Sequence, residues 1–501
     1  MAGLVIYGIG AVIIWLALRS IYRLYFHPLS KFPGAKLAAI TSGYEFYYNV
    51  IKSGSYIWEV DRMHKVYGPI IRIGPREIRI KDPEYYDEIY ASSARRREKD
   101  PLKVAQFALE GSAFASISPE SHRERRAPLE KFFSRQSISK LEPLIYESID
   151  KLSQHLQKAY KSNKVVRLDA GFAGLTSDII YQYTYGQSAG NLDQEDFNES
   201  VRDGANALLR GGHIAYFLPV LQTITYSLPL WMLKKISPSA FTLASQKHDL
   251  YLRSVEALHK KTPTDNGHTI LDTLVSPSMP AHLRTAERIT NEGHSITVAG
   301  IETTARTLSV GTYYLFTNES IRLKLRQELR EAMPTLDSRP TWYQLEKLPY
   351  LSAVVNESLR MSIGISDASP RVAPTESLVY NNYVIPPGTM VSQVHYFILT
   401  DPTIFPNPHT FDPERWIRAA EKGERLEKYI VNFSKGSRIC LGKNLAYAEL
   451  FLVFAALVRQ FELELYETPK SVVEFVRDFG FPAPDEGDLK IRALVKEVIG
   501  Y

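Results

Sequence analysis

The chain's only cysteine, Cys440, limits the chemistry that its 501 residues can support. A single thiol excludes an intrachain disulfide, a CxxC redox pair and a zinc site built from several cysteines. Cys440 lies in the segment FSKGSRICLG, between Gly436 and Gly442. Glycines at these positions allow the backbone to turn tightly and to approach a flat ligand closely. Whatever Cys440 binds, it binds without a second thiol.

The residues around Cys440 favour a thiolate. Arg438 places a permanent positive charge two residues before the sulfur, which suits an anionic group on a bound ligand. The apolar helical pattern that starts at 441 puts the sulfur just before a helix N-terminus, where backbone N–H groups favour thiolate over thiol. A lone thiolate that serves as an axial ligand of haem iron fits this arrangement. The alternative is a buried cysteine that acts as a small apolar side chain.

The N-terminal residues predict a membrane anchor. Residues 2–18, AGLVIYGIGAVIIWLAL, carry no charge, and Arg19, Arg23 and Lys31 follow them. A helix of this length rises about 25 Å, close to the thickness of the hydrocarbon core of a bilayer. Basic residues after the apolar run, with no cleavage site evident, predict an uncleaved anchor whose C-terminal side stays in the cytosol. A buried core helix is the alternative.

We divide the chain into an anchor with its flank over residues 1–26, a proline-rich elbow over 27–34 and a catalytic domain over 35–501. The elbow holds Pro28, Pro33 and Gly34. Proline fixes φ and cannot continue a helix, so the elbow would hold the domain at a set angle to the bilayer.

Helical patterns dominate the body and predict a mainly α fold with small β-sheets. They cover roughly residues 120–160, 170–210, 240–260, 280–320, 320–333, 345–362 and 441–460. Short β-like runs lie at 70–80 and 371–395, and no alternating strand–helix units, GxGxxG after a strand or GxxxxGK[ST] occur. The uncharged stretch 214–233 is long enough for a second membrane span, but Pro219 and Pro229 favour an interfacial or substrate-lining segment.

Five residues match the pattern FxxGxRxCxG, namely Phe433, Gly436, Arg438, Cys440 and Gly442. A chance match in a chain of this size is expected on the order of once in ten thousand. On these residues the chain resembles the cytochrome P450 superfamily of haem-thiolate monooxygenases. The resemblance implies haem b as cofactor, iron bound by the Cys440 thiolate, and a long central helix over the haem. The elbow and the segment DPTIFPNP at 401–408 are similar to membrane-bound fungal members, especially trichodiene oxygenase-like enzymes of secondary metabolism.

A second segment, Ala299-Gly300-Ile301-Glu302-Thr303-Thr304, lies in the middle of a long helical pattern. The resemblance places it over the distal face of the haem, where Ala299 and Gly300 leave room for dioxygen. It also implies that Glu302 and Thr303 pass protons to bound oxygen, as a carboxyl group and a hydroxyl group in a helix groove can do. A solvated helix face is the alternative.

Two further motifs imply a structural network. Glu357 and Arg360 are three residues apart, which places acid and base on one helix face, and Arg415 follows in the sequence PERW. The resemblance implies that these three residues form a buried network that braces the haem loop. We therefore expect them to act in folding and not in catalysis.

Four basic residues are the expected partners of the haem propionates. His122 and Arg126 are four residues apart and share a helix face. The resemblance implies that they bind the propionates together with Arg371 and Arg438. A histidine at position 122 departs from the family pattern, in which many members have tryptophan.

The resemblance predicts hydroxylation or epoxidation of an apolar small molecule, a terpenoid or polyketide-like secondary metabolite. The candidate substrate contacts are apolar: Phe107, Phe114, Phe217, Ile296 and Ile365. Three alternatives remain: a haem-thiolate isomerase or dehydratase, a haem-binding membrane protein without catalytic activity, such as a carrier or sensor, and a membrane-anchored interaction protein without haem.

The partners follow from what the chain lacks. Without flavin or NADPH motifs it needs electrons from NADPH through a separate NADPH–cytochrome P450 reductase, with cytochrome b5 as a further candidate donor. We expect a single-pass protein of the endoplasmic reticulum membrane with its catalytic domain in the cytosol. Its 60 Lys and Arg against 55 Asp and Glu leave a net charge of +5, too small and dispersed for binding nucleic acid.

Overall fold

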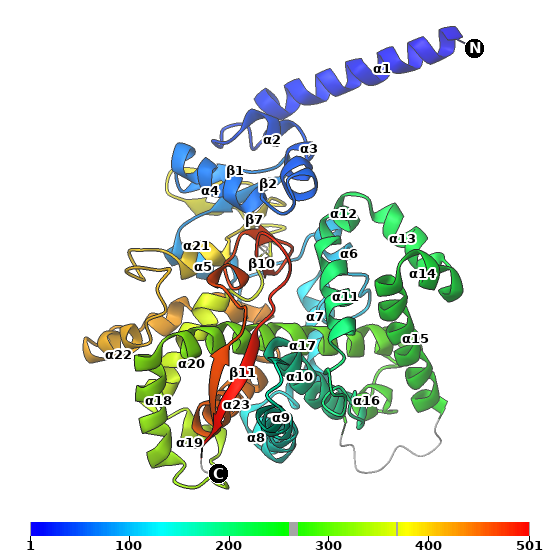
Figure 1. The fold of residues 1–501 in the computed structure, drawn as a ribbon. Coiled ribbons are helices and arrows are strands. Elements are labelled where there is room, and N and C mark those ends of the chain that lie inside the picture. The colour runs from blue at the N-terminus through cyan, green and yellow to red at the C-terminus, as the bar shows by residue number, and fades with distance from the viewer. Residues whose placement is uncertain (1, 260–268, 367–368, 500–501) are drawn as a thin grey trace.

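The structure is a computed structural model that describes residues 2–259, 269–366 and 369–499. The predicted mainly α fold with small sheets is confirmed. The helix α17 (Ala286–Thr317) crosses the middle of the molecule, and the other long helices pack around it (Figure 1). The helices that precede it are α1 (Ala2–Ile21), α2 (Lys36–Ile40), α3 (Gly43–Phe46), α4 (Tyr56–Tyr67), α5 (Tyr86–Ile89), α6 (Pro101–Ala105), α7 (Pro119–Glu130), α8 (Arg135–Ser139), α9 (Glu142–Ser162), α10 (Leu168–Tyr185), α11 (Glu199–Arg210), α12 (Gly212–Phe217), α13 (Pro219–Ser227), α14 (Leu230–Ile236), α15 (Pro238–His259) and α16 (Ile270–Val275). Those that follow are α18 (Glu319–Ala332), α19 (Trp342–Leu345), α20 (Pro349–Ser362), α21 (His395–Leu399), α22 (Glu414–Glu421) and α23 (Lys443–Gln460).

The strands form four small sheets. The largest has the order β1 (Ile70–Arg72), β2 (Glu77–Ile80), β7 (Met390–Ser392) and β4 (Arg371–Val372), in which β2 and β7 are parallel. A second joins β3 (Val166–Arg167), β11 (Arg492–Val498) and β8 (Phe461–Leu465). Two hairpin-like pairs complete the set: β5 (Leu378–Tyr380) with β6 (Tyr383–Ile385), and β9 (Arg477–Asp478) with β10 (Pro482–Ala483). The first sheet connects residues near 70–80 to residues near 371–392, the two regions in which the sequence predicts strands.

Two of the predicted helical patterns are interrupted. The pattern over 120–160 divides into α7, α8 and α9, and the pattern over 170–210 divides into α10 and α11. Gly186, with φ +73°, ends α10 in a left-handed conformation that glycine adopts without steric cost. The helical pattern over 170–210 is therefore two helices with a break after Gly186.

The helix α1 projects away from the body, which leaves it free to enter a bilayer (Figure 1). The apolar segment Leu4–Phe26 is long enough to span a membrane, and none of its most apolar stretch is buried. This exposure excludes the alternative of a buried core helix. The elbow behind it packs on the body, because Leu29 and Phe32 are buried and the Arg72 N–H donates to the Pro33 carbonyl at 2.7 Å.

The stretch 214–233 folds as three short helices. Pro219 is the first residue of α13 and Pro229 is the cap of α14, so each proline starts a new helix instead of continuing the previous one. Within the described residues one helix alone, at the N-terminus, meets the length and hydropathy of a membrane span. Val220, Ile224 and Trp231 are exposed, as a segment at a membrane interface would have them.

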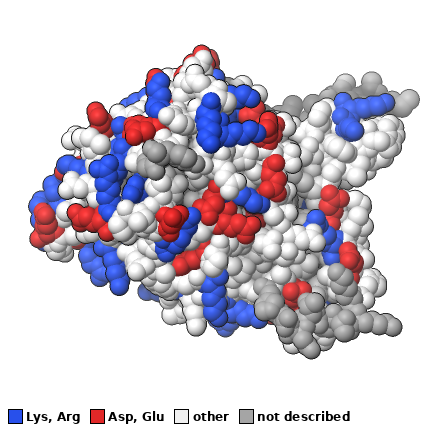
Figure 2. Space-filling view, turned by 60° about the horizontal axis from the view of Figure 1, so that its bottom comes forward, with Lys and Arg blue, Asp and Glu red and all other residues white. Residues whose placement is uncertain are grey.

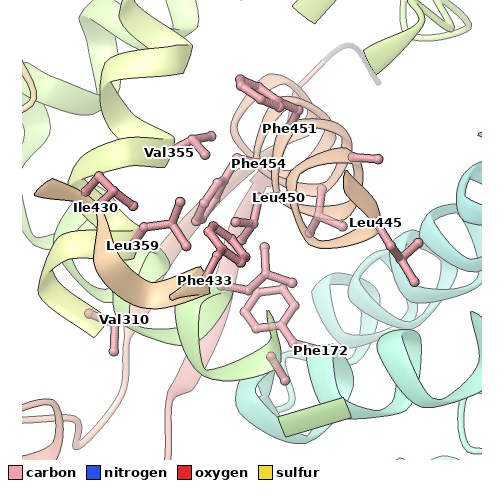
Figure 3. Close-up of a cluster of buried hydrophobic side chains, with 14 of the residues drawn as sticks. Phe172, Val310, Val355, Leu359, Ile430, Phe433, Leu445, Leu450, Phe451 and Phe454 are labelled. Atoms are coloured by element: carbon pink, nitrogen blue, oxygen red, sulfur yellow. The ribbon is translucent and has the colours of Figure 1, made fainter. Parts of the chain in front are cut away.

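The core joins the Cys440 segment to the central helices. Phe433 lies among Val355 and Leu359 of α20 and Phe454 of α23, with Val310 of α17 nearby (Figure 3). The core therefore holds the end of the Cys440 loop rigidly.

On the face that Figure 2 draws, basic and acidic side chains are interspersed, and no continuous basic field covers it.

We predict that deleting residues 2–21 releases the protein from membranes and leaves its stability nearly unchanged. The helix α1 makes no buried contacts along its apolar stretch, so the change in the free energy of unfolding should stay below about 1 kcal/mol. Membrane sedimentation of the expressed protein and urea unfolding of the soluble variant measure the two effects. A variant that stays fully membrane-bound would show that α13 and α14 suffice for attachment.

Candidate active site

The Cys440 loop is short and closed on itself. The Cys440 N–H donates to the Phe433 carbonyl at 2.8 Å, and Phe433 is buried in the core. Gly442 caps α23, so Cys440 lies three residues before the first residue of that helix. The buried aromatic ring thus fixes one end of the loop, and the helix fixes the other.

The two glycines of the loop have different reasons to be glycine. Gly436 has φ +70°, and a Cβ atom there would lie 2.1 Å from the Ala91 carbonyl oxygen and 2.2 Å from that of Tyr90. No atom lies within 4 Å of a Cβ built at Gly442, and its φ is −82°. Gly436 therefore allows close approach of two protein backbones, whereas Gly442 leaves open space.

The thiol of Cys440 is solvent-accessible although the protein surrounds it. Burial raises the pKa of this thiol, while the Gly442 N–H and the positive charges of Arg126 and Lys443 lower it to a smaller extent. The predicted lowering of the Cys440 pKa by the backbone at the start of α23 is present, but burial raises this pKa by more. The thiolate therefore needs a further positive partner, which a bound metal ion would supply.

The structure brings the four predicted basic residues together and adds a fifth, Lys99. Burial, followed by the charge of Arg371, lowers the pKa of Arg438 to about 10. Burial, followed by the charges of Arg438 and Arg126, lowers the pKa of His122 to about 3. The pKa values of Lys99 and Arg371 are also lowered, in both cases chiefly by burial. The sequence analysis missed Lys99, because it lies in the basic run RRREK at 95–99, in which no single residue is distinguished by a motif.

This cluster of cations, defined as Lys99, His122, Arg126, Arg371 and Arg438, has a surplus of positive charge. The guanidinium of Arg438 donates to the carbonyls of Ser116 and Ile117, both at 2.6 Å, but its buried Nε lacks a hydrogen-bond partner among the described residues. Neutral carbonyls do not compensate for buried like charges, so an anion would stabilise the cluster. A ligand with two carboxylates fits this arrangement.

The middle of α17 is accessible, in contrast to most of its length. Val298 is 45% exposed, whereas 305–312 are buried. Ala299 belongs to this accessible stretch, and the Thr303 hydroxyl donates to its carbonyl at 2.9 Å. A Cβ at Gly300 would meet Ile180 of α10 at 3.0 Å. Gly300 therefore allows α10 and α17 to pack closely.

Glu302 has a partner that the sequence analysis missed. Arg202 of α11 donates from Nη2 to Glu302 at 3.1 Å and binds Asp169 of α10 with its other nitrogen. Burial lowers the pKa of Arg202, but the carboxylates of Glu302 and Asp169 raise it by a larger amount, so the net shift is upward. Glu302 and Thr303 are neighbours on α17, yet each side chain has its own partner. No local motif indicates Arg202, because it lies 100 residues from Glu302 in the sequence.

The residues expected in the bracing network lie together. Glu357 accepts hydrogen bonds from Arg360 at 2.9 and 2.7 Å and from Arg415 at 3.2 Å. Trp416 Nε1 and the Asp412 N–H also donate to it, at 3.0 and 2.9 Å. Glu357 and Arg360 are completely buried. The carboxylate thus connects α20 to the segment that leads into α22.

The comparisons with known proteins identify the family. A family model for cytochrome P450 matches residues 42–485. The chain belongs to the cytochrome P450 family. It is 40% identical over 494 residues to cytochrome P450 monooxygenase astB of Aspergillus terreus, which covers 97% of this chain and 96% of the relative. It is 42% identical to conidiogenone synthase PchP450 of Penicillium rubens over 478 residues, 95% and 96% of the two chains. It is also 42% identical to cytochrome P450 monooxygenase TRI4 of Fusarium sporotrichioides over 465 residues, 93% and 89% of the two chains.

The cofactor and the class of enzyme follow from the family. Cytochromes P450 bind haem iron through a cysteine thiolate, and this protein is a cytochrome P450 monooxygenase. The predicted family is thereby confirmed. The observed residues fit the haem, because the chain holds one accessible cysteine next to cations that need an anion.

We predict that Glu357→Gln lowers the free energy of unfolding by about 3–5 kcal/mol, because it leaves two buried arginines without a negative partner. Urea unfolding of the purified protein measures the loss. Arg339→Ala, which removes a pair with Asp150 at 2.8 Å on the surface, is the control and should cost less than about 1 kcal/mol. Equal losses in the two variants would contradict the network's role in folding.

Proposed function

We propose that this protein is a membrane-bound monooxygenase that hydroxylates or epoxidises an apolar small molecule of fungal secondary metabolism. The accessible thiol of Cys440, next to a cluster of cations with surplus charge, is the observation that carries the proposal. Cys440 is the chain's only cysteine, and the family requires a thiolate. When bound, the haem supplies the activation of dioxygen.

Each residue of the site then has a task. The cluster of cations would hold the haem propionates, with the neutral imidazole of His122 as a hydrogen-bond donor. Phe433 and Gly436 would fix the loop that carries the thiolate, and Gly442 leaves space beside it. Ala299 and Gly300 would shape the helix above the haem. Glu357, Arg360 and Arg415 would brace the loop without touching the haem.

Protons would reach the site through Glu302 and Thr303. Arg202 holds the Glu302 carboxylate at one end of a buried series of charges that includes Asp169. The Thr303 hydroxyl can rotate from the Ala299 carbonyl and pass a proton onward. Ordered proton delivery needs side chains that carry the proton in turn and that keep bulk water out of the site.

The substrate would be a terpenoid or polyketide-like molecule. Phe107, Phe114 and Ile365 are exposed, and such side chains suit an apolar carbon skeleton. Two other candidate contacts are less suitable: Ile296 is buried in the core, and the Phe217 ring packs on Phe46 at 5.3 Å. The relatives named as monooxygenases and as conidiogenone synthase support a small-molecule substrate.

Electrons would come from NADPH through a separate reductase, with cytochrome b5 as a second donor. Both would act at the endoplasmic reticulum, because α1 is a candidate anchor and Arg19 and Arg23 follow its apolar run. The catalytic domain would then face the cytosol as a single-pass protein, divided as residues 1–26, 27–34 and 35–501.

The carbon monoxide difference spectrum of the reduced protein tests the proposal. We expect a strongly red-shifted Soret band for the wild type and its loss in Cys440→Ser. A band at shorter wavelength in the wild type would mean that the iron has a ligand other than a thiolate. Addition of NADPH and a reductase should then produce consumption of dioxygen that depends on an apolar substrate.

We predict that Glu302→Gln lowers turnover on the order of 100-fold without changing the carbon monoxide spectrum, because the amide cannot carry the proton. Dioxygen consumption against product formed, in H₂O and in D₂O, measures the effect. Glu199→Gln is the matched control, since Glu199 belongs to the same group of charges but is paired with Arg167 at the surface. An unchanged rate and isotope effect in Glu302→Gln would contradict the role in proton delivery.

A further inference from the structure

A buried carboxylate fastens the loop 106–118, which joins α6 to α7, onto the central helix α17. The Ala113 N–H approaches both carboxylate oxygens of Glu292, at 3.2 and 3.0 Å. Arg288, one turn earlier on α17, donates to the same carboxylate at 2.9 Å. Glu292 and Arg288 are 2% and 6% exposed. None of the cytochrome P450 motifs in the sequence contains either residue.

Contacts with two neighbouring helices add to the loop's own turns. Ala108 has φ +49°, a conformation that costs a residue with a Cβ atom free energy, and Gly111 has φ +83°. Lys247 of α15 donates to the Ala108 carbonyl at 3.0 Å, and Asn291 of α17 donates to the Glu110 carbonyl at 2.9 Å. The Ser112 N–H also donates to the Leu109 carbonyl at 3.1 Å, so a turn within the loop and side chains of the two neighbouring helices together hold residues 108–113.

The second half of the loop is tied to the cluster of cations. Lys99 Nζ donates to the Phe114 carbonyl at 2.6 Å and lies 3.9 Å from the centre of the Phe114 ring. Arg438 holds the next carbonyls, those of Ser116 and Ile117. Ala113 is thus the junction between a part held by α17 and a part held by the expected haem-binding cations.

The position of Ala113 determines the direction in which the Phe114 side chain extends. Ala113 and Ala115 are buried, whereas Phe114 between them is 39% exposed and meets the ring of Phe107 edge-on at 5.1 Å. The hydrogen bond from the Ala113 N–H to the Glu292 carboxyl group fixes the backbone from which the Phe114 side chain extends. Glu292, through Ala113, and Lys99, through the Phe114 carbonyl, together hold the backbone that carries Phe114.

We propose that Glu292, paired with Arg288, is a positioning residue that clamps the loop 106–118 to α17 and sets how fast bulky apolar molecules enter and leave the haem side. This inference rests on the proposed function. The clamp acts through Phe114 and Phe107, and Glu292 itself touches neither substrate nor haem.

The clamp is sensitive to pH in a defined direction. Burial raises the pKa of Glu292 to about 7, while Arg288 on α17, the Ala113 N–H and Arg125 on α7 act in the opposite direction. Glu124 on α7 faces Arg288 in turn. Opening of the loop would hydrate the carboxyl group and return its pKa toward 4.5. The closed loop therefore binds the proton more tightly, and closure weakens as the pH rises through 7.

The test uses the full-length, haem-loaded protein and the double variant Arg288→Ala/Glu292→Ala, which removes both charges together and leaves neither unpaired. We expect faster hydrogen exchange of the amides in 109–116 and dissociation of clotrimazole, a bulky apolar azole, about 10-fold faster than from the wild type. Dissociation of imidazole, which needs only access to the iron, should change less than about 2-fold. The control Asp61→Ala/Lys81→Ala removes a partly buried pair with a 2.8 Å contact between α4 and the end of β2, and should change neither rate.

A second variant keeps the proposal falsifiable if the double variant fails to fold. In Arg288→Gln/Glu292→Gln the side chain at 292 can still accept from Ala113, is neutral at every pH and leaves no buried charge unpaired. Azole dissociation from it should therefore lose the acceleration between pH 6 and 8 that we expect for the wild type. Unchanged loop exchange in the alanine double variant, or a retained pH dependence in the glutamine double variant, would overturn the inference. The carbon monoxide spectrum of the wild type reports separately on the proposed function, so the two failures are distinguishable.

Discussion

The carboxylate of Glu357 is the point at which the irregular segment between α21 and α22 is tied to α20. Five donors from two arginines, a tryptophan and a backbone amide converge on it, and the arginines continue to the carbonyls of Leu399, Pro406, Pro408 and Thr410. An irregular segment cannot pair its own backbone groups as a helix or sheet does, so buried side chains must do it. The brace lets the chain pass beneath α20 without regular structure, and the Cys440 loop is then packed on the same helix through Phe433.

Buried charge follows opposite rules on the two sides of the expected haem. On the α17 side most buried bases have an acid: Arg202 is shared by Glu302 and Asp169, and Arg288 pairs with Glu292, whereas Arg306 donates to the Ser362 carbonyl. Around Cys440 the bases exceed the acids, and burial lowers the pKa of Lys99, His122, Arg371 and Arg438. A folded chain tolerates such a surplus when a bound anion completes it, and this asymmetry is the physical reason why the cluster of cations indicates a cofactor with carboxylates.

Residues close together in the sequence were predictable, and residues joined only by folding were not. FSKGSRICLG, the Glu357–Arg360 pair and the proline breaks at 219 and 229 each follow from local geometry. Arg202 and Trp416 have no local pattern, because their partners lie on other elements far along the chain. Glu292 is four residues from Arg288, but its bond to Ala113 joins residues 179 positions apart. Gly300 shows the intermediate case: its position was predictable, but its contact with Ile180 depends on how α10 crosses α17.

The loop 106–118 connects these two systems of charge. Its first half is held by the balanced pair on α17, and its second half by cations that a bound anion would also attract. The Arg438 Nε–H has no partner among the described residues and the Lys99 ammonium has three N–H donors, so an anion at the cluster need not displace the loop carbonyls of Phe114, Ser116 and Ile117. Occupancy of the cluster would then make the second half of the loop more rigid, and any opening would be confined to the residues that Glu292, Asn291 and Lys247 hold. The conformational freedom that the proposed clamp would control therefore lies in residues 108–113, which one buried carboxylate beside Arg288 ties to α17.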